Sequence, residues 1–157
     1  MTGVITLLVN KQNHARSVEK DAQARNTAAL ESVTLSIEDV THALLKHWSF
    51  IMEWARNNEK GIKASEEKIK QITELRSEVF HLFKGLTNSE GRLLLLGCVG
   101  QQRKLREYGN VISEYHRYSS RSNEQMLSSE LETWRTKILE TREQLYASLN
   151  RAYRAEK

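Results

Sequence analysis

Residues 15–55, ARSVEKDAQARNTAALESVTLSIEDVTHALLKHWSFIMEWA, carry one apolar stripe that keeps a single phase throughout. Its positions recur in steps of three, four and four residues: Ala15, Val18, Ala22, Asn26, Ala29, Val33, Ile37, Val40, Leu44, Trp48, Ile51 and Ala55. A repeat of about eleven residues per three turns is typical of a straight or slightly right-handed helix. Only Asn26 interrupts the stripe. The stretch therefore predicts one long helix over residues 14–57, and a kink near Ser36 is the alternative that the sequence leaves open.

The stripe changes in side-chain size along its length. Its first half holds mostly alanine, whereas residues 37–51 contribute isoleucine, leucine and tryptophan. Burial of large apolar side chains stabilises a fold more than burial of small ones. We therefore expect the second half to hold the other helices together, and the first half to be free to meet a partner. At ~1.5 Å per residue this helix would be about 60 Å long, which predicts a rod.

Three further segments show apolar residues at helical spacing. They predict helices over residues 63–86, 89–119 and 122–156. Asn57, Asn58 and Gly61 indicate the first turn, the segment 87–90 matches a capping box that would start the third helix, and serines near residue 120 indicate the last turn. Arg76 interrupts one position of the second apolar seam.

Composition supports this assignment. The chain has 157 residues, no proline and only 7 glycines, so few residues oppose helix formation. Short turns favour antiparallel neighbours. The predicted fold is all-α: an elongated, coiled-coil-like up-down-up-down four-helix bundle in one domain, residues 14–157, preceded by a short N-terminal arm, residues 1–13.

The predicted arm is a short apolar patch rich in β-branched residues. Val4, Ile5, Leu7 and Leu8 lie in it. We expect an extended segment, which would pack against the bundle's own groove or against a neighbouring subunit because a lone strand exposes unpaired backbone groups.

The distribution of charge indicates where an anion could bind, and the cysteine content and N-terminus indicate the cellular compartment. A net charge of +4 comes entirely from residues 81–157, so any anion-facing surface should lie there. Cys98 is the single cysteine and cannot form an internal disulfide. The N-terminus lacks the basic start and longer apolar core of a signal peptide, and no apolar run approaches the roughly 20 residues that span a bilayer. A cytoplasmic location is expected, and export by a signal-less route stays open.

Catalytic and metal motifs are sparse. Glu78 and His81, like Glu38 and His42, have the spacing of ligands on one helical face, but a carboxylate-bridged metal site needs more than one such pair in the right phase. Cys98 has no base beside it in a recognisable motif. We therefore expect no metal, no cofactor and no enzymatic activity.

Two segments suggest other functions. Basic residues interleaved with tyrosines in the third helix could contact nucleic acid, although a solvated face with Tyr108 and Tyr115 buried is favoured; the basic candidates are Arg103, Lys104, Arg106, Arg117 and Arg121. The apolar segment 93–99 predicts either a plug at the end of the bundle or a membrane-active segment.

The function that we expect is helix-face packing in a non-enzymatic interaction or assembly protein. Its partner would be a second copy or another protein, with nucleic acid and membrane as less favoured alternatives. The candidate contact residues are Val4, Ile5, Leu7, Leu8, Trp54, Leu93, Leu95 and Leu96.

Overall fold

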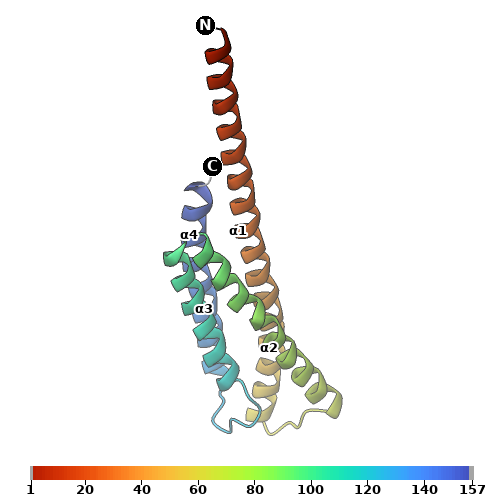
Figure 1. Ribbon diagram of the computed structural model, residues 1–157. Helices are drawn as coiled ribbons and strands as arrows, with labels where there is room; N and C mark the ends of the chain where they lie inside the picture. Colours follow the sequence, from red (N-terminus) through yellow and green to blue (C-terminus); the bar gives the residue numbers. More distant parts are fainter. Residues whose placement is uncertain (1, 156–157) are drawn as a thin grey trace.

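A computed structural model describes residues 2–155 of the protein. They form α1 (Thr2–Glu59), α2 (Glu66–Leu95), α3 (Val99–Tyr118) and α4 (Ser128–Ala155). The helices run alternately down and up the long axis (Figure 1). α1 and α3 each pack against both α2 and α4. The predicted all-α four-helix bundle is therefore confirmed.

The second half of the α1 stripe forms the centre of the bundle. Its large members are buried, from Val33 through Ile37 and Leu44 to Ile51. The helix is continuous through Ser36, as the single phase of the stripe predicts. Tyr108 and Tyr115 of α3 are fully buried against this core, as expected.

The first half of α1 projects beyond the bundle. The upper part of α1 extends past the C-terminal end of α4 with no helix beside it (Figure 1). None of the side chains from Thr2 to Ala29 is buried, and complete burial begins at Leu30. The expected division of α1 into a packed half and an unpacked half is confirmed.

The prediction of an extended N-terminal arm is wrong, because residues 2–13 are the first turns of α1. A helix satisfies its own backbone hydrogen bonds, whereas a strand at this place would need a partner. The tendency of β-branched residues toward strands depends on such a partner. The segment therefore continues the helix that follows it.

The predicted boundary between the second and third helices, at residues 87–88, is also wrong. α2 runs through residues 87–90 and ends at Leu95. Gly85 lies where α2 approaches α1: a Cβ at this glycine would lie 3.4 Å from Ser36 Oγ. The chain turns instead at Gly97, whose φ is +74°. The amides of Gly97 and Cys98 donate to the carbonyls of Leu94 and Leu93 in a Schellman motif.

α4 begins later than predicted, at Ser128, because residues 119–127 form a loop with its own hydrogen bonds. The Leu127 amide donates to the Tyr118 hydroxyl, and Asn123 Nδ2 donates to the Tyr118 carbonyl. Glu59, at the end of α1, accepts hydrogen bonds from the Ser128 amide and hydroxyl at 2.7 and 2.9 Å. These contacts fix the start of α4. Residue 156, the predicted end of that helix, lies outside the described residues.

The division of α1 predicts different costs for two similar substitutions. Ile37 is 0% exposed and Leu35, two residues away, is 66% exposed. Ile37→Ala should lower the free energy of unfolding by about 2–5 kcal/mol, whereas Leu35→Ala should change it by less than about 0.5 kcal/mol. Urea unfolding monitored by circular dichroism measures both. Equal losses would contradict this placement of the core.

Candidate functional site

The projecting part of α1 presents an uncovered apolar stripe. Because residues 2–13 are helical, Val4 and Leu8 fall in phase with Ala15, Val18 and Ala22. The spacing from Val4 to Ala22 alternates between four and three residues, which is the heptad pattern of a coiled-coil seam. Val4, Leu8 and Val18 are 65%, 58% and 52% exposed. The stripe that forms the core below therefore continues upward without a partner helix.

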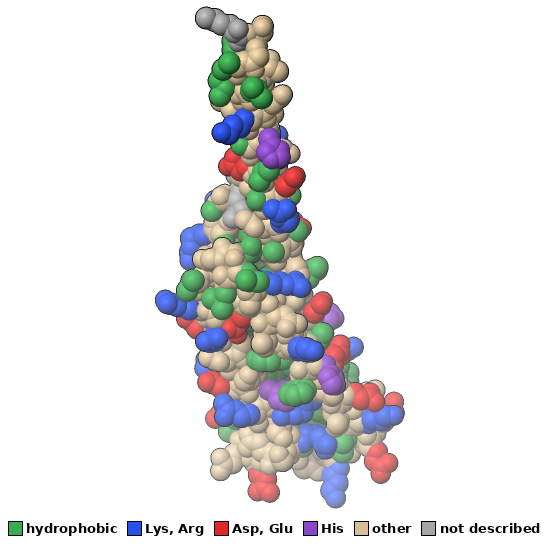
Figure 2. Space-filling model, viewed as in Figure 1, with side chains coloured by type: hydrophobic (Ala, Val, Ile, Leu, Met, Phe, Trp, Pro, Cys, Tyr) green, Lys and Arg blue, Asp and Glu red, His purple; other side chains and the backbone are tan. Residues whose placement is uncertain are grey.

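The tip of this helix is the most apolar part of the projection. Ile5 and Leu7 flank the stripe, Val9 lies farther round the helix, and all three are exposed. Figure 2 shows hydrophobic side chains gathered near the projecting end. Lys11 is the one charged residue at a stripe position between Val4 and Ala22. An apolar patch of this kind on a protein surface is typical of an interaction site.

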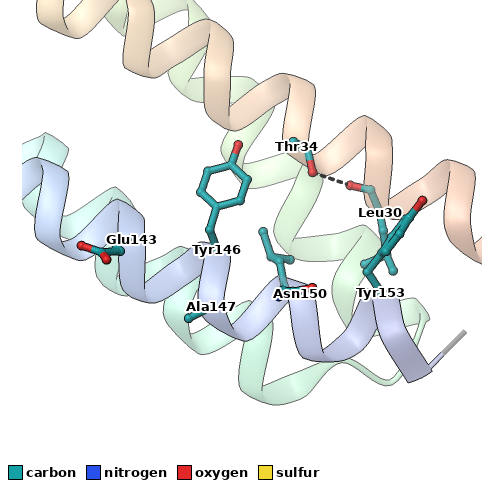
Figure 3. A pocket seen from close by; sticks show the side chains of 8 residues that line it. Leu30, Thr34, Glu143, Tyr146, Ala147, Asn150 and Tyr153 are labelled. Atoms are coloured by element: carbon teal, nitrogen blue, oxygen red, sulfur yellow. Dashed lines mark hydrogen bonds between the residues drawn. The ribbon is translucent and has the colours of Figure 1, made fainter.

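An open pocket lies at the base of the projection, between α1 and α4. It has a volume of about 550 Å³, and its lining includes Leu30 and Thr34 of α1 and Tyr146, Asn150 and Tyr153 of α4. The rings of Tyr146 and Tyr153 extend from α4 toward α1 (Figure 3).

A polar contact between α1 and α4 involves Tyr146, one of the residues that line this pocket. Arg142 of α4 donates to Glu38 Oε1 at 2.6 and 3.1 Å, and the Tyr146 hydroxyl donates to the same oxygen at 2.6 Å. Burial acts to raise the pKa of Glu38, but the hydrogen bonds from Tyr146 and Arg142 outweigh it, so the pKa is lowered. The contact ties α1 to α4.

The leucine run at the end of α2 is split between the core and the surface. Leu93 is buried and Leu96 packs partly against the core. Leu94 and Leu95 point outward, and Leu95 is 89% exposed. The segment is the last turn of α2 and not a separate helix, and within residues 2–155 no helix is long and apolar enough to cross a membrane.

The tryptophans belong mainly to the bundle. Trp54, proposed from the sequence as an exposed contact, is partly buried and packs against the core. Trp48 donates from Nε1 to the Leu131 carbonyl at 2.7 Å, which joins α1 to α4. Trp134 lies beside the Tyr118 ring. Trp54 lies off the apolar stripe of α1, but other side chains also cover this flank of the helix, so Trp54 is not the exposed contact that its spacing predicted.

The basic residues that the sequence singled out do not form one patch. Lys104 pairs with Glu107 at 2.7 Å, and Arg106 pairs with Glu90 at 2.9 Å. Arg103, Arg117 and Arg121 are exposed. Arg117 and Arg121 line different pockets beside α2.

A buried polar cluster lies between α1, α2 and α3. His47 Nδ1 of α1 is 2.9 Å from the Tyr115 hydroxyl of α3. Arg76 of α2 donates from Nη2 to His116 Nδ1 at 3.2 Å, so His116 must be neutral to accept. Arg76 forms no ion pair with any carboxylate in residues 2–155. The sequence indicated Arg76 as unusual, because it is a charged residue at an otherwise apolar position of the second helix.

This cluster disfavours additional positive charge. Burial, together with the charges of Arg76 and His116, lowers the pKa of His47 to about 3. Burial and the charge of Arg76 also lower the pKa of His116. Burial raises the pKa of Tyr115. At neutral pH the cluster therefore holds two neutral imidazoles, a neutral phenol and one charged guanidinium.

The Glu/His pairs considered as metal ligands are separated or otherwise engaged. Glu38, His42 and Glu78 line one open pocket of about 440 Å³ between α1 and α2. Glu38 is bound to Arg142 and Tyr146, and His81 does not line this pocket. Among the described residues no three His, Cys, Asp or Glu side chains are grouped so that they could hold a metal ion.

Comparisons with known proteins assign no relative. No family model matches the chain, and no curated protein or solved structure matches it significantly.

The depressed pKa of His47 predicts a loss of stability in acid. Below about pH 6.5 the unfolded chain takes up a proton at His47, but the folded protein does not do so until about pH 3. Between about pH 7.5 and about pH 5 this one residue should cost on the order of 2 kcal/mol of unfolding free energy. Urea titrations at the two pH values measure the loss.

His47→Gln is the matched variant, because an amide can keep a hydrogen bond to Tyr115 without titrating. It should lose less stability over the same pH interval, and the remaining loss should include the contribution of His116. The same pH dependence in the variant and the unaltered protein would contradict the assignment to His47.

Proposed function

We propose that this protein is a non-enzymatic assembly protein, and that two copies pair through the projecting part of α1. The observation that carries the proposal is the stripe from Val4 to Ala22, which continues the buried stripe of the core in phase but has no helix against it.

An unsupported helix of this length and composition needs a partner. Isolated helices are marginal in water because most helix stability in proteins comes from packing of an apolar face. Residues 2–21 are exposed and residues 22–29 are at most partly buried, so this part of α1 receives little such packing from the described part of the chain. Pairing of heptad seams provides it through side chains that insert between those of the facing helix. A second α1 carries a seam of the same spacing.

The position of the bundle selects an antiparallel arrangement. The bundle occupies the same side of α1 as the exposed stripe, since one stripe serves both halves. Two parallel copies facing each other along this stripe would bring their bundles into collision. Two antiparallel copies place the bundles at opposite ends of the paired segment. Such a contact has twofold symmetry, so one surface patch serves both copies.

The side chains along the stripe fit one antiparallel register. When Leu8 of one copy faces Val18 of the other, Val4 faces Ala22 and Lys11 faces Ala15. Val4 and Lys11 then oppose alanines, Leu8 packs against Val18, and Lys11 does not meet Lys11 of the other copy. In a parallel pair Lys11 would face Lys11, and like charges in contact are unfavourable. The overlap of residues 4–22 is roughly 28 Å long.

The register also suits the end of the bundle. The tip at Thr2 reaches the level of Ala24 in the other copy, just before the open pocket that begins at Leu30. Tyr153 and the end of α4 lie in that region. The exposed tip residues Ile5 and Leu7 would therefore be covered in part near the bundle of the other copy.

Charged substitutions in the seam should separate the copies. Leu8→Glu combined with Val18→Glu places carboxylates against an apolar surface, and such a buried unpaired charge costs several kcal/mol. The dimer dissociation constant should therefore rise at least about 100-fold. Sedimentation equilibrium over a range of micromolar concentrations measures it.

Asn10→Glu combined with Ser17→Glu is the control, because both residues are exposed on the opposite side of the same helix and the charge change is the same. This variant should dimerise like the unaltered protein. A monomer at every concentration would refute self-assembly. A complex of monomeric protein with a different protein, lost in the Leu8/Val18 variant, would assign the stripe to that other partner.

Engineered cysteines distinguish the two orientations. In a Cys98→Ser background, protein with Val4→Cys mixed with protein carrying Ala22→Cys should form a mixed disulfide dimer under mild oxidation. Val4→Cys alone should not, because its two copies would lie roughly 27 Å apart in the antiparallel register. Efficient self-crosslinking of Val4→Cys would show a parallel pair.

A further inference from the structure

Another pocket lies at the end of the bundle opposite the projecting helix, and basic and hydroxyl-bearing side chains line it. It has a volume of about 250 Å³ and lies between α2 and the loop that follows α3. Its lining combines two arginines with four hydroxyl-bearing residues and one isoleucine: Arg76, Arg121, Ser119, Ser120, Ser122, Thr73 and Ile72. No carboxylate lines it.

One buried polar atom of this lining lacks a partner. Arg76 Nη1 is inaccessible to solvent and forms no hydrogen bond within residues 2–155. Ser119 is 1% exposed, and its hydroxyl lies against the Tyr115 phenol. Buried polar groups in proteins almost always have a partner, so the unpartnered guanidinium nitrogen indicates a missing one.

The missing partner should be an anion. Arg76 is half-buried and has only the neutral His116 as a side-chain partner, and partial withdrawal of a guanidinium from water without a counter-charge is unfavourable. Arg121 adds a second positive charge at the rim. The carbonyl end of α3 carries roughly half a negative charge, which offsets only part of the two.

The donor set matches a tetrahedral oxyanion. Guanidinium groups bind phosphate oxygens through charge-assisted hydrogen bonds. Serine hydroxyls rotate to donate to further oxygens, and Ser120 and Ser122 both line the pocket. We propose that this pocket binds a phosphate-like oxyanion, either free phosphate or a phosphomonoester, through Arg76, Arg121 and the hydroxyls of Ser120 and Ser122.

Calorimetric titration of the full chain with inorganic phosphate tests the proposal, with chloride and acetate at equal ionic strength as reference anions. Phosphate should bind at one site per chain, and neither reference anion should. Arg76→Met should weaken phosphate binding at least about tenfold, because a charge-assisted hydrogen bond is lost. Arg121→Gln should weaken it in the same direction, and this exposed substitution does not disturb the core.

Arg103→Gln is the matched control, since Arg103 is exposed on α3 and lines none of the described pockets. It should bind phosphate like the unaltered protein. Absence of phosphate binding, equal binding of acetate, or unchanged binding in both the Arg76 and Arg121 variants would overturn the proposal. Phenyl phosphate separates the two sources of the ligand: tighter binding than phosphate indicates a phosphomonoester, and equal or weaker binding indicates free phosphate.

Discussion

The length of α1 is the constraint on which the rest of the structure depends. α1 has 58 residues, whereas α4, which runs beside it, has 28. At ~1.5 Å per residue, roughly 87 Å of helix meets a neighbour of roughly 42 Å. Because the apolar stripe keeps its phase over both halves, the same side of the helix is core below Leu30 and surface above it. The bundle therefore ends in an apolar projection.

The other end of the bundle is organised around buried polar groups. His47 and Tyr115 join α1 to α3 inside the core, and Arg76 approaches them from α2. His47 Nε2 and Arg76 Nη1 are buried without a hydrogen-bond partner among the described residues. Both residues act on Tyr115 or on each other. The apolar projection and the buried polar cluster thus lie in different parts of one rod.

Periodicity predicted the helices better than local signals predicted where they end. Eleven-residue repeats located the core of α1 correctly, because burial follows the phase of a helix. The capping-box pattern at residues 87–90 was misleading, because α2 continues through it and Gly85 lies at a helix crossing. The serines near residue 120 do mark the last turn, but hydrogen bonds of Tyr118 and Asn123 make the loop before α4 longer than predicted. The polar pocket combines Arg76 with residues more than forty positions later, so only the folded chain brings its donors together.

Hydrogen exchange along α1, measured by mass spectrometry at several protein concentrations, tests the central claim most directly. Amides of residues 33–55 should exchange slowly at every concentration, because this half lies in the core of each copy. Amides of residues 4–22 should exchange fast in dilute solution and more slowly as the concentration rises. Fast exchange of residues 33–55, or exchange of residues 4–22 that does not depend on concentration, would contradict the division of α1 into a core half and an assembly half.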